Sequence, residues 1–400
     1  MNISLKKQQL SVSKNVALGV AQIFLWGGSF FILSVLAEPI MKETNWSHSM
    51  VYGSLSLSLL ISGLLSPKIG KLINSNNKDF VLLYSGMIMS LGLLILGFAN
   101  QFWVFVIGWA VLGIAMGMGL YDALFALLGK QFGKEANKSI VQITLVSGFA
   151  PTISWFFISC LLSNFGWRYT CFIYAAALFI VIFPIHKYIL RPNNIKECQF
   201  TKTNTPKTNL NDVFHSKIFY LLLINFIIGS VLMSGLIIHL VDILLTKKIE
   251  METAIIIAAL LGPSQVGVRV LDIILPKKTP VKTAIISSIA ILLGLLLLLF
   301  SSKTASFGVI IFGMGNGMRS ILRGTLPLAI FGHQNYAEIL GKLARLPLIA
   351  QAITPFVGGI VIQLFSVSVF LYVLCILAFI NIFLILSIEK KVKINNMIKL

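Results

Sequence analysis

Long apolar runs separated by short polar gaps repeat along the whole chain. A helix that crosses a bilayer needs about 20 mostly apolar residues. Backbone groups inside a bilayer must pair within the protein, and the alternating pattern of barrel strands is absent from the sequence. The pattern predicts an all-α membrane protein of about twelve transmembrane helices. These are expected at residues 16–41, 49–72, 80–100, 102–129, 138–163, 169–190, 217–245, 253–275, 282–300, 304–331, 343–365 and 367–388.

Composition supports a lipid environment. Of the 400 residues, 57% are hydrophobic and 11% are charged, and the mean hydropathy is +0.92. A soluble domain carries roughly 25% charged residues. The net charge of +19 comes from Lys and Arg in the polar gaps, so we expect the bilayer and not nucleic acid as the partner. The four cysteines show neither metal-ligand nor disulfide spacing, and we expect no metal and no cofactor.

The placement of Lys and Arg predicts the orientation. Gaps on one side hold 24 of these residues and gaps on the other side hold five, while Arg269, Arg319 and Arg323 lie within or at the ends of the runs. Positive residues concentrate on the cytoplasmic side of membrane proteins. The bias predicts a multi-pass protein of the bacterial inner membrane with both termini in the cytoplasm.

The chain divides into two similar halves. The longest polar gap, 191–216, reads as a solvated cytoplasmic linker between helical bundles at 1–190 and 217–400. An internal repeat with an offset close to 200 residues supports this division. Its matched pairs are Gly113 and Gly117 with Gly313 and Gly317, Gly28-Ser29 with Gly229-Ser230, and Pro151 with Pro355.

The gap between the second and third runs resembles the motif Gly-x-x-x-Asp-Arg-x-Gly-Arg/Lys of the major facilitator superfamily. Gly70 and Lys78 match this motif, whereas Asn74 replaces its acid, Ser75 its arginine and Asn77 its second glycine. The motif is therefore degenerate, and its charged interactions are in doubt here.

The second half keeps an acid and a base at the corresponding place, Arg269 and Asp272. Other stretches resemble a bacterial branch of the superfamily related to the monocarboxylate-carrier-like group. These are Asn45-Trp46-Ser47, Gly119 to Phe125, Gly148-Phe149, Gly166-Trp167-Arg168, Gly262 to Arg269 and Arg323 to Pro327. The resemblance implies two pseudo-symmetric six-helix bundles, with Gly70, Asn74, Lys78, Arg269 and Asp272 as a conformational motif.

Arg319 and Arg323 are candidates for an anion-binding site. They lie four residues apart, so both guanidinium groups share one helical face. A charge at a helix centre costs about 2.5–3.5 kcal/mol on insertion scales, and arginine forks suit carboxylates and phosphates. The alternative is structural, with the arginines paired to acids or carbonyls or reaching the aqueous surface. Tyr121, Asn316 and Gln265 are further candidates for lining the substrate cavity.

Asp122 is the deepest acid, and the repeat places it at the depth of the two arginines. We hypothesise an ion pair between Asp122 and Arg319 or Arg323 that closes the cytoplasmic side and that protonation or a substrate carboxylate would break. Asp122 is therefore a candidate both for substrate binding and for proton coupling. The alternative is a static partner within the same half.

Glu38, His239 and Asp242 are candidates for proton coupling on the outer side. His239 and Asp242 share a face of one helix, and a histidine beside a carboxylate titrates near neutral pH. The alternative is that all three simply lie at the wetted membrane interface.

These observations predict a secondary transporter, not an enzyme. No phosphate loop for ATP is present, so gradients, in particular of protons, would supply the energy. The expected substrate is a small organic anion, such as a carboxylate or a carboxylate-type metal chelator (siderophore), moved by a monomer through alternating access. The alternatives are an efflux pump for hydrophobic or cationic compounds, a membrane receptor or scaffold, and a channel. The drug-antiporter signature Gly-Pro-x-x-Gly-Gly is missing around Pro151.

Overall fold

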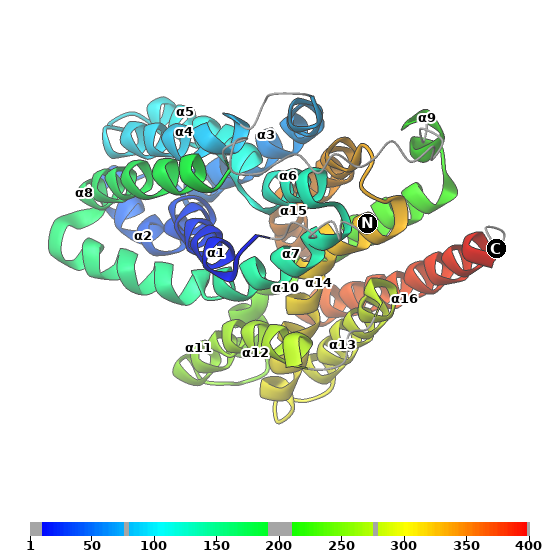
Figure 1. The fold of residues 1–400 in the computed structure, drawn as a ribbon. Helices are drawn as coiled ribbons and strands as arrows, with labels where there is room; N and C mark the ends of the chain where they lie inside the picture. The colour runs from blue at the N-terminus through cyan, green and yellow to red at the C-terminus, as the bar shows by residue number, and fades with distance from the viewer. Residues whose placement is uncertain (1–9, 76–79, 191–209, 275–278, 398–400) are drawn as a thin grey trace. The chain divides into compact units, whose positions relative to one another are not determined.

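The computed structural model describes the chain except residues 1–9, 76–79, 191–209, 275–278 and 398–400 (Figure 1). Every element in the described part is helical. The elements are α1 (Val12–Trp26), a π-helix (Gly27–Phe31), α2 (Ile32–Thr44), α3 (His48–Asn74), α4 (Phe80–Gly97), α5 (Phe102–Gly119), α6 (Tyr121–Phe132), a 3₁₀ turn (Gly133–Glu135), α7 (Ala136–Ser147), α8 (Ala150–Ile189), α9 (Leu210–Phe214), α10 (Lys217–Thr246), α11 (Met251–Ala259), α12 (Leu261–Ile274), α13 (Pro280–Phe300), α14 (Ala305–Phe331), α15 (Tyr336–Leu364) and α16 (Val367–Met397).

These helices confirm the predicted membrane fold. Ten stretches among the described residues are long and apolar enough to cross a membrane. One of them, Ala136–Ile189, contains two crossings, because Gly166 turns the chain with φ 76° and ψ 171°. The remaining crossing is α14, whose 27 residues are long enough but whose apolar run is interrupted by two arginines. The count of about twelve therefore agrees with the structure.

Three predicted helices differ from expectation because they are interrupted. The fourth breaks at Leu120 between α5 and α6, the fifth at Gly148 and Phe149 between α7 and α8, and the eighth at Leu260 between α11 and α12. A break within apolar sequence leaves hydropathy unchanged, so the sequence profile missed all three. The short helix α9 also lies inside the segment predicted as a linker.

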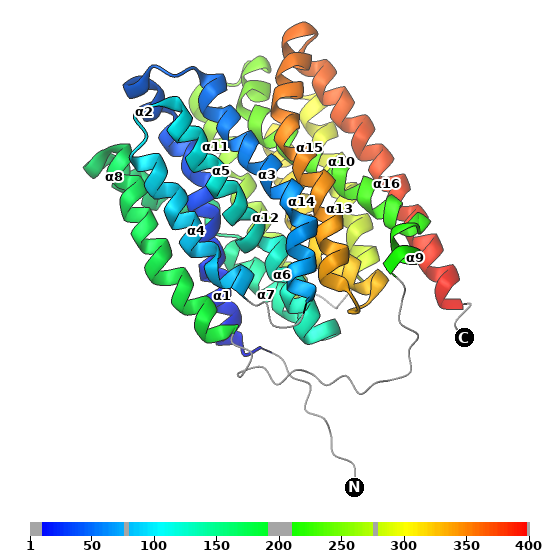
Figure 2. The ribbon, with the colours of Figure 1, turned by 90° about the horizontal axis from the view of Figure 1, so that it is seen from above.

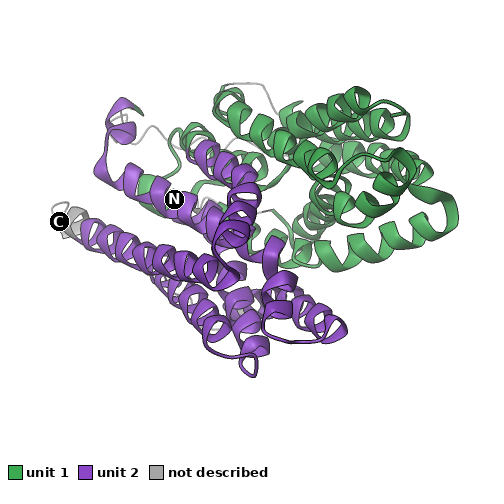
Figure 3. Ribbon diagram, turned by 180° about the vertical axis from the view of Figure 1, so that it is seen from behind, with its two compact units in different colours: residues 1–210, 327–342 green, residues 211–326, 343–400 purple. Residues whose placement is uncertain are grey.

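The described chain forms two compact units, shown in Figure 3. Unit 1 comprises residues 1–210 and 327–342, and unit 2 comprises residues 211–326 and 343–400. Residues 327–342, the end of α14 and the start of α15, thus pack with unit 1, although they follow and precede parts of unit 2. We call them the crossover segment.

Glycines bring corresponding helices together in both units. In unit 1, a methyl group at Gly113 of α5 would lie 2.7 Å from the carbonyl oxygen of Ser58 on α3. In unit 2, a methyl group at the matched Gly313 of α14 would lie 3.1 Å from the carbonyl oxygen of Leu261, where α12 begins. Small residues allow such backbone approach where lipid gives no hydrophobic driving force. The predicted repeat therefore corresponds to equivalent packing in each unit.

A second pair of glycine crossings was not predicted. Gly92 of α4 faces Gly108 of α5, and the two helices run side by side in unit 1 (Figure 2). Gly294 of α13 faces Gly308 of α14 in the same way in unit 2. Around this second crossing lies a core of buried residues from α10, α13, α14 and α16, including Phe312.

A polar cluster ties together three parts of unit 1. Arg168, at the start of the second crossing in α8, donates from Nε to Glu43 Oε1 of α2 at 2.9 Å. Its NH1 group donates to the carbonyl oxygens of Gly97 and Ala99 at 3.0 and 2.9 Å. Trp167 donates from Nε1 to Glu43 Oε2 at 2.6 Å. One guanidinium group therefore joins α2, α8 and the end of α4.

We expect Arg168→Met to destabilise the protein by about 2 kcal/mol, because it removes charge-assisted hydrogen bonds to a carboxylate and two carbonyls. Thermal unfolding in detergent measures the change. The control is Lys42→Met, since Lys42 pairs with Glu38 where both side chains are more than 70% exposed. Equal effects of the two substitutions would contradict a stabilising function of the cluster.

Candidate functional site

Arg319 lies partly buried in unit 2 between α14 and α10. Its Nε donates to Asn316 Oδ1 on the same helix at 3.2 Å, and its NH2 group donates to Met233 Sδ of α10 at 3.2 Å. Gly229 of α10 leaves space for the guanidinium group, because a methyl group there would lie 3.0 Å from NH1. Both acceptors are uncharged, and a thioether is a weak one. These two acceptors therefore hold the arginine without neutralising its charge.

Two of the other predicted binding residues of unit 2 lie along the same helix, and a third lies on α12. Asn316 is 4% exposed and its amide fixes Arg319. Arg323 is one turn further along α14, and its charge acts on Arg319. Gln265 of α12 is partly buried, and its backbone packs against Gly317. Unit 2 thus has Asn316 and the two arginines close together on α14, and their part in substrate binding stays a prediction.

Tyr121 and Asp122 open α6 in unit 1, directly after the break at Leu120. The Tyr121 hydroxyl is 2.7 Å from Ser147 Oγ, and its ring stacks on Phe125 and contacts Trp26. Asp122 occupies the first turn of the helix, where backbone N–H groups favour a negative charge. Its pairing with Arg319 or Arg323 stays a prediction, because the residues belong to different units.

The three candidates for proton coupling on the outer side lie in different surroundings, Glu38 in unit 1 and His239 and Asp242 in unit 2. Glu38 Oε1 is 2.7 Å from Lys42 Nζ, and its side chain is 72% exposed. His239 of α10 contacts the carbonyl oxygen of Pro355 through Nε2 at 3.2 Å and packs edge-on against Phe370. The charge of Asp242, which is exposed, acts on His239. Unit 2 brings His239 and Asp242 together, while Glu38 has a lysine partner that the sequence reading missed.

The predicted conformational motif lies at the ends of α3 and α12. Gly70 and Asn74 belong to α3, while Lys78 lies outside the described residues. Arg269 of α12 is buried and donates from NH2 to Ser320 Oγ at 2.8 Å. Asp272 follows three residues later on the same helix. Arg269 therefore ties α12 to α14 within unit 2.

The crossover segment packs closely on the motif in unit 1. Asn74 Nδ2 donates to Asn335 Oδ1 at 3.2 Å, and Ser66 Oγ donates to the Gly341 carbonyl oxygen at 2.9 Å. A methyl group at Gly70 would lie 2.5 Å from the carbonyl oxygen of Ala337. The amide of Asn74 thus binds the segment where the family motif has an acid.

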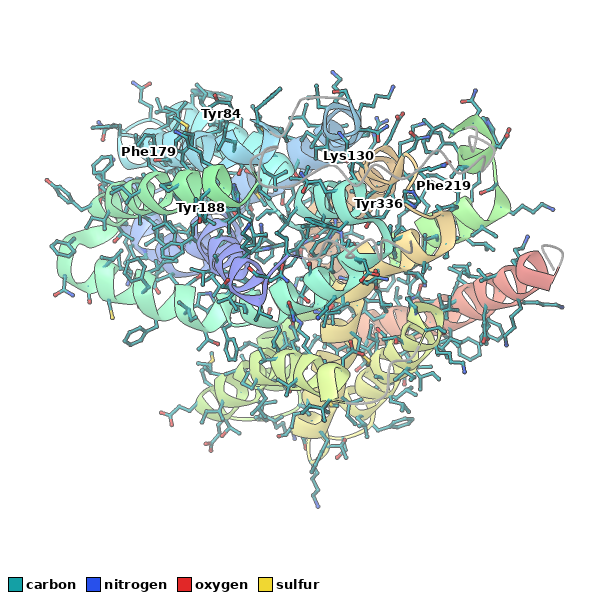
Figure 4. The ribbon with its side chains drawn as sticks, viewed as in Figure 1. Tyr84, Lys130, Phe179, Tyr188, Phe219 and Tyr336 are labelled. Atoms are coloured by element: carbon teal, nitrogen blue, oxygen red, sulfur yellow. The ribbon has the colours of Figure 1, made fainter. Side chains whose placement is uncertain are left out.

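Two further side chains hold this arrangement. Tyr336 of the crossover segment is fully buried, with its ring against Gly129 of α6. Lys130, the next residue of α6, donates from Nζ to the carbonyl oxygens of Ile73 and Ser75 at 2.7 and 3.0 Å, where α3 ends. Both side chains are labelled in Figure 4. The sequence analysis did not predict a function for either side chain. Gly129 was the one residue that indicated a close contact at this place.

Comparison with known proteins identifies a family and several proteins of similar fold. Residues 18–344 match the model of the Major Facilitator Superfamily, and no curated protein matches the sequence. The fold is similar to that of the proton:xylose symporter XylE bound to 6-bromo-6-deoxy-D-glucose (13% identity, TM-score 0.74, covering 94% of this chain and 95% of that one). It is also similar to that of the human organic anion transporter MFSD10, with 13% identity and a TM-score of 0.74 over 94% of this chain and 100% of that one. A third similar structure is the transporter FucP in its outward conformation, with 10% identity and a TM-score of 0.71 over 93% of this chain and 98% of that one.

We expect Gly341→Ala to loosen the crossover segment, because the added methyl would lie 2.5 Å from the backbone oxygen of Ser66. Amide hydrogen exchange of residues 336–343 should then speed up. Gly359→Ala is the matched control, since that glycine lies on the same helix with nothing within 4 Å of an added methyl. Unchanged exchange in Gly341→Ala would show that the contact is not tight.

Proposed function

Since the chain belongs to the major facilitator superfamily, we propose that it is a proton-coupled secondary transporter for a small organic anion. Carboxylates and carboxylate-type metal chelators are the expected substrates. The two halves, joined by a cytoplasmic linker, would expose the site alternately to the two sides of a bacterial inner membrane. The protein is therefore a transporter and not an enzyme, and the proteins of similar fold are transporters too.

The observation that carries the anion proposal is the environment of Arg319. A guanidinium group within a membrane helix needs an anionic partner or water. Among the described residues, its hydrogen bonds go to an amide oxygen and a thioether, neither of which carries a negative charge. Arg323, one turn away, adds a second positive charge on the same face. An anion that binds both would remove their mutual repulsion and accept bidentate hydrogen bonds.

The similar structures support transport but do not choose the substrate. One of those proteins carries xylose with protons and another is an organic anion transporter. At 13% identity they share the fold with this chain, and substrate specificity depends on individual side chains. The choice of an anion therefore rests on the two arginines. An efflux pump for cations is the alternative, and it would not need either arginine.

We expect organic acids to raise the thermal stability of the purified protein and Arg319→Gln to weaken their binding at least about tenfold. A charge-assisted hydrogen bond contributes roughly 1.5–3 kcal/mol, and a ligand stabilises the state that it binds. The panel should contain carboxylates, chelators and cationic drugs. Lys303→Gln removes the same charge at an exposed position and serves as the control. If only cations stabilise the protein, and equally in both variants, the anion site is wrong.

Proton coupling has a separate test in proteoliposomes. We expect an imposed pH gradient to drive accumulation of the stabilising acid above its external concentration, and a protonophore to abolish the accumulation. Uptake that stops at equal concentrations with and without the gradient would exclude coupling. Binding in the thermal experiment would then still support the anion site.

A further inference from the structure

A row of aromatic rings in unit 1 surrounds the point where the first helical crossing changes its winding. Each ring contacts the next, from α6 through α1 and the π-helix to α8. The rings belong to Phe125, Tyr121, Trp26, Phe30, Phe31 and Trp155. Trp155, at one end of the row, is 43% exposed. We call these six side chains the aromatic cluster.

The π-helix brings two consecutive rings onto Trp26. Phe30 and Phe31 follow Trp26 on the chain, and their ring centroids lie 5.9 and 6.1 Å from that of Trp26. In an α-helix only residues three or four positions apart face each other, so a further contact at five positions depends on the wider winding. A π-helix is rare and is found frequently at functional sites. Its position in the cluster favours a function beyond core packing.

Two buried polar atoms at the cluster have no hydrogen-bond partner among the described residues. They are Gln22 Oε1 and Trp26 Nε1. Gln22 is 0% exposed, and its Nε2 donates to the carbonyl oxygen of Gly119 at 2.7 Å, directly before the break at Leu120. This hydrogen bond fixes the amide and leaves its oxygen turned away from that carbonyl. Gln22 and Trp26 are one helical turn apart, so both side chains lie on one face of α1.

The two atoms together select a chemical group. Trp26 Nε1 is a donor and Gln22 Oε1 is an acceptor, and a single hydroxyl group can accept from the one and donate to the other. Buried indole N–H groups normally have a partner, as Trp155 Nε1 does in Ser34 Oγ at 2.8 Å. The rings around Trp26 suit a flat partner, because aromatic rings favour stacked and edge-on contacts with one another.

We propose that the aromatic cluster is a binding site for a hydroxylated aromatic ring. The hydroxyl group pairs with Trp26 Nε1 and Gln22 Oε1, and the ring packs against Trp26 and Phe31. Both polar atoms are covered in this conformation, so these two rings part when the ligand enters, and the π-helix is where the backbone adjusts. This inference rests on the proposed transport of organic anions and narrows their class to acids that carry a phenolic ring.

The experiment is isothermal titration calorimetry of the purified full-length protein with four probes. These are para-hydroxybenzoate, benzoate, the saturated-ring analogue of para-hydroxybenzoate, and the uncharged para-hydroxybenzamide. We expect para-hydroxybenzoate to bind at least about tenfold more tightly than benzoate, because a site built for a hydroxyl group is left with unpaired atoms by an analogue that lacks it. The saturated analogue should bind about tenfold more weakly too, because its ring is not flat.

Trp26→Phe keeps an aromatic ring and removes the N–H group. It should lower the affinity for para-hydroxybenzoate to that for benzoate and leave benzoate binding unchanged. Trp109→Phe is the matched control. Trp109 is 1% exposed and its Nε1 also has no partner among the described residues, but its ring lies outside the cluster. This variant should keep the preference of the wild type.

Several outcomes would overturn the binding site. Equal binding of the three acids to the wild type, which a water molecule bridging the two atoms would produce, leaves only the anion proposal. A preference that Trp26→Phe leaves intact, or an equal loss of both aromatic acids, would show that the indole N–H group reads no hydroxyl. Binding of none of the probes would refute the site as well. If para-hydroxybenzamide binds as tightly as para-hydroxybenzoate and depends on Trp26, the site stands and the anion proposal fails.

Discussion

The absence of water inside a bilayer is the constraint on which this structure depends. Each backbone N–H and C=O group must find a partner within the protein, which favours unbroken helices. An interruption is tolerated only where neighbouring elements supply partners. The break at Leu120 meets this condition inside unit 1, and it starts a new helix with Tyr121 and Asp122 in its first turn. The interruption thus places an acid where exposed N–H groups stabilise it.

The two units share their packing but not their chemistry. Glycines at Gly113 and Gly313 bring corresponding helices into backbone contact in each unit, as Gly92 and Gly294 do at a second crossing. Packing of this kind depends on small residues at fixed spacing, which a duplication preserves. Charged groups within the helices follow no such repeat: unit 1 has Asp122 and unit 2 has Arg319.

Hydropathy predicted most of the helix ends to within a few residues because it averages over whole crossings. The same averaging hides the break at Leu120. It also put the start of the eleventh helix at 343, whereas α15 begins at Tyr336 with charged residues in its first two turns. The hydrogen bond between Arg319 and Asn316 follows from helical spacing and could have been predicted from the sequence. The contact of Arg319 with Met233 on another helix could not. Contacts between distant segments, such as Asn74 with Asn335, depend on tertiary structure alone.

The course of α14 links the arginines to the crossover segment. The helix passes from unit 2 into unit 1 at Pro327, about two turns beyond Arg319 and one turn beyond Arg323. A proline has no N–H group, so the carbonyl of Arg323 receives no helical hydrogen bond from it, and the helix bends most easily there. Beyond this point the chain is held on α3 by the Asn74 and Ser66 hydrogen bonds to the crossover segment. One helix, α14, therefore carries Arg319 and Arg323 in unit 2 and ends, at residues 327–331, in the part of the chain that packs with unit 1.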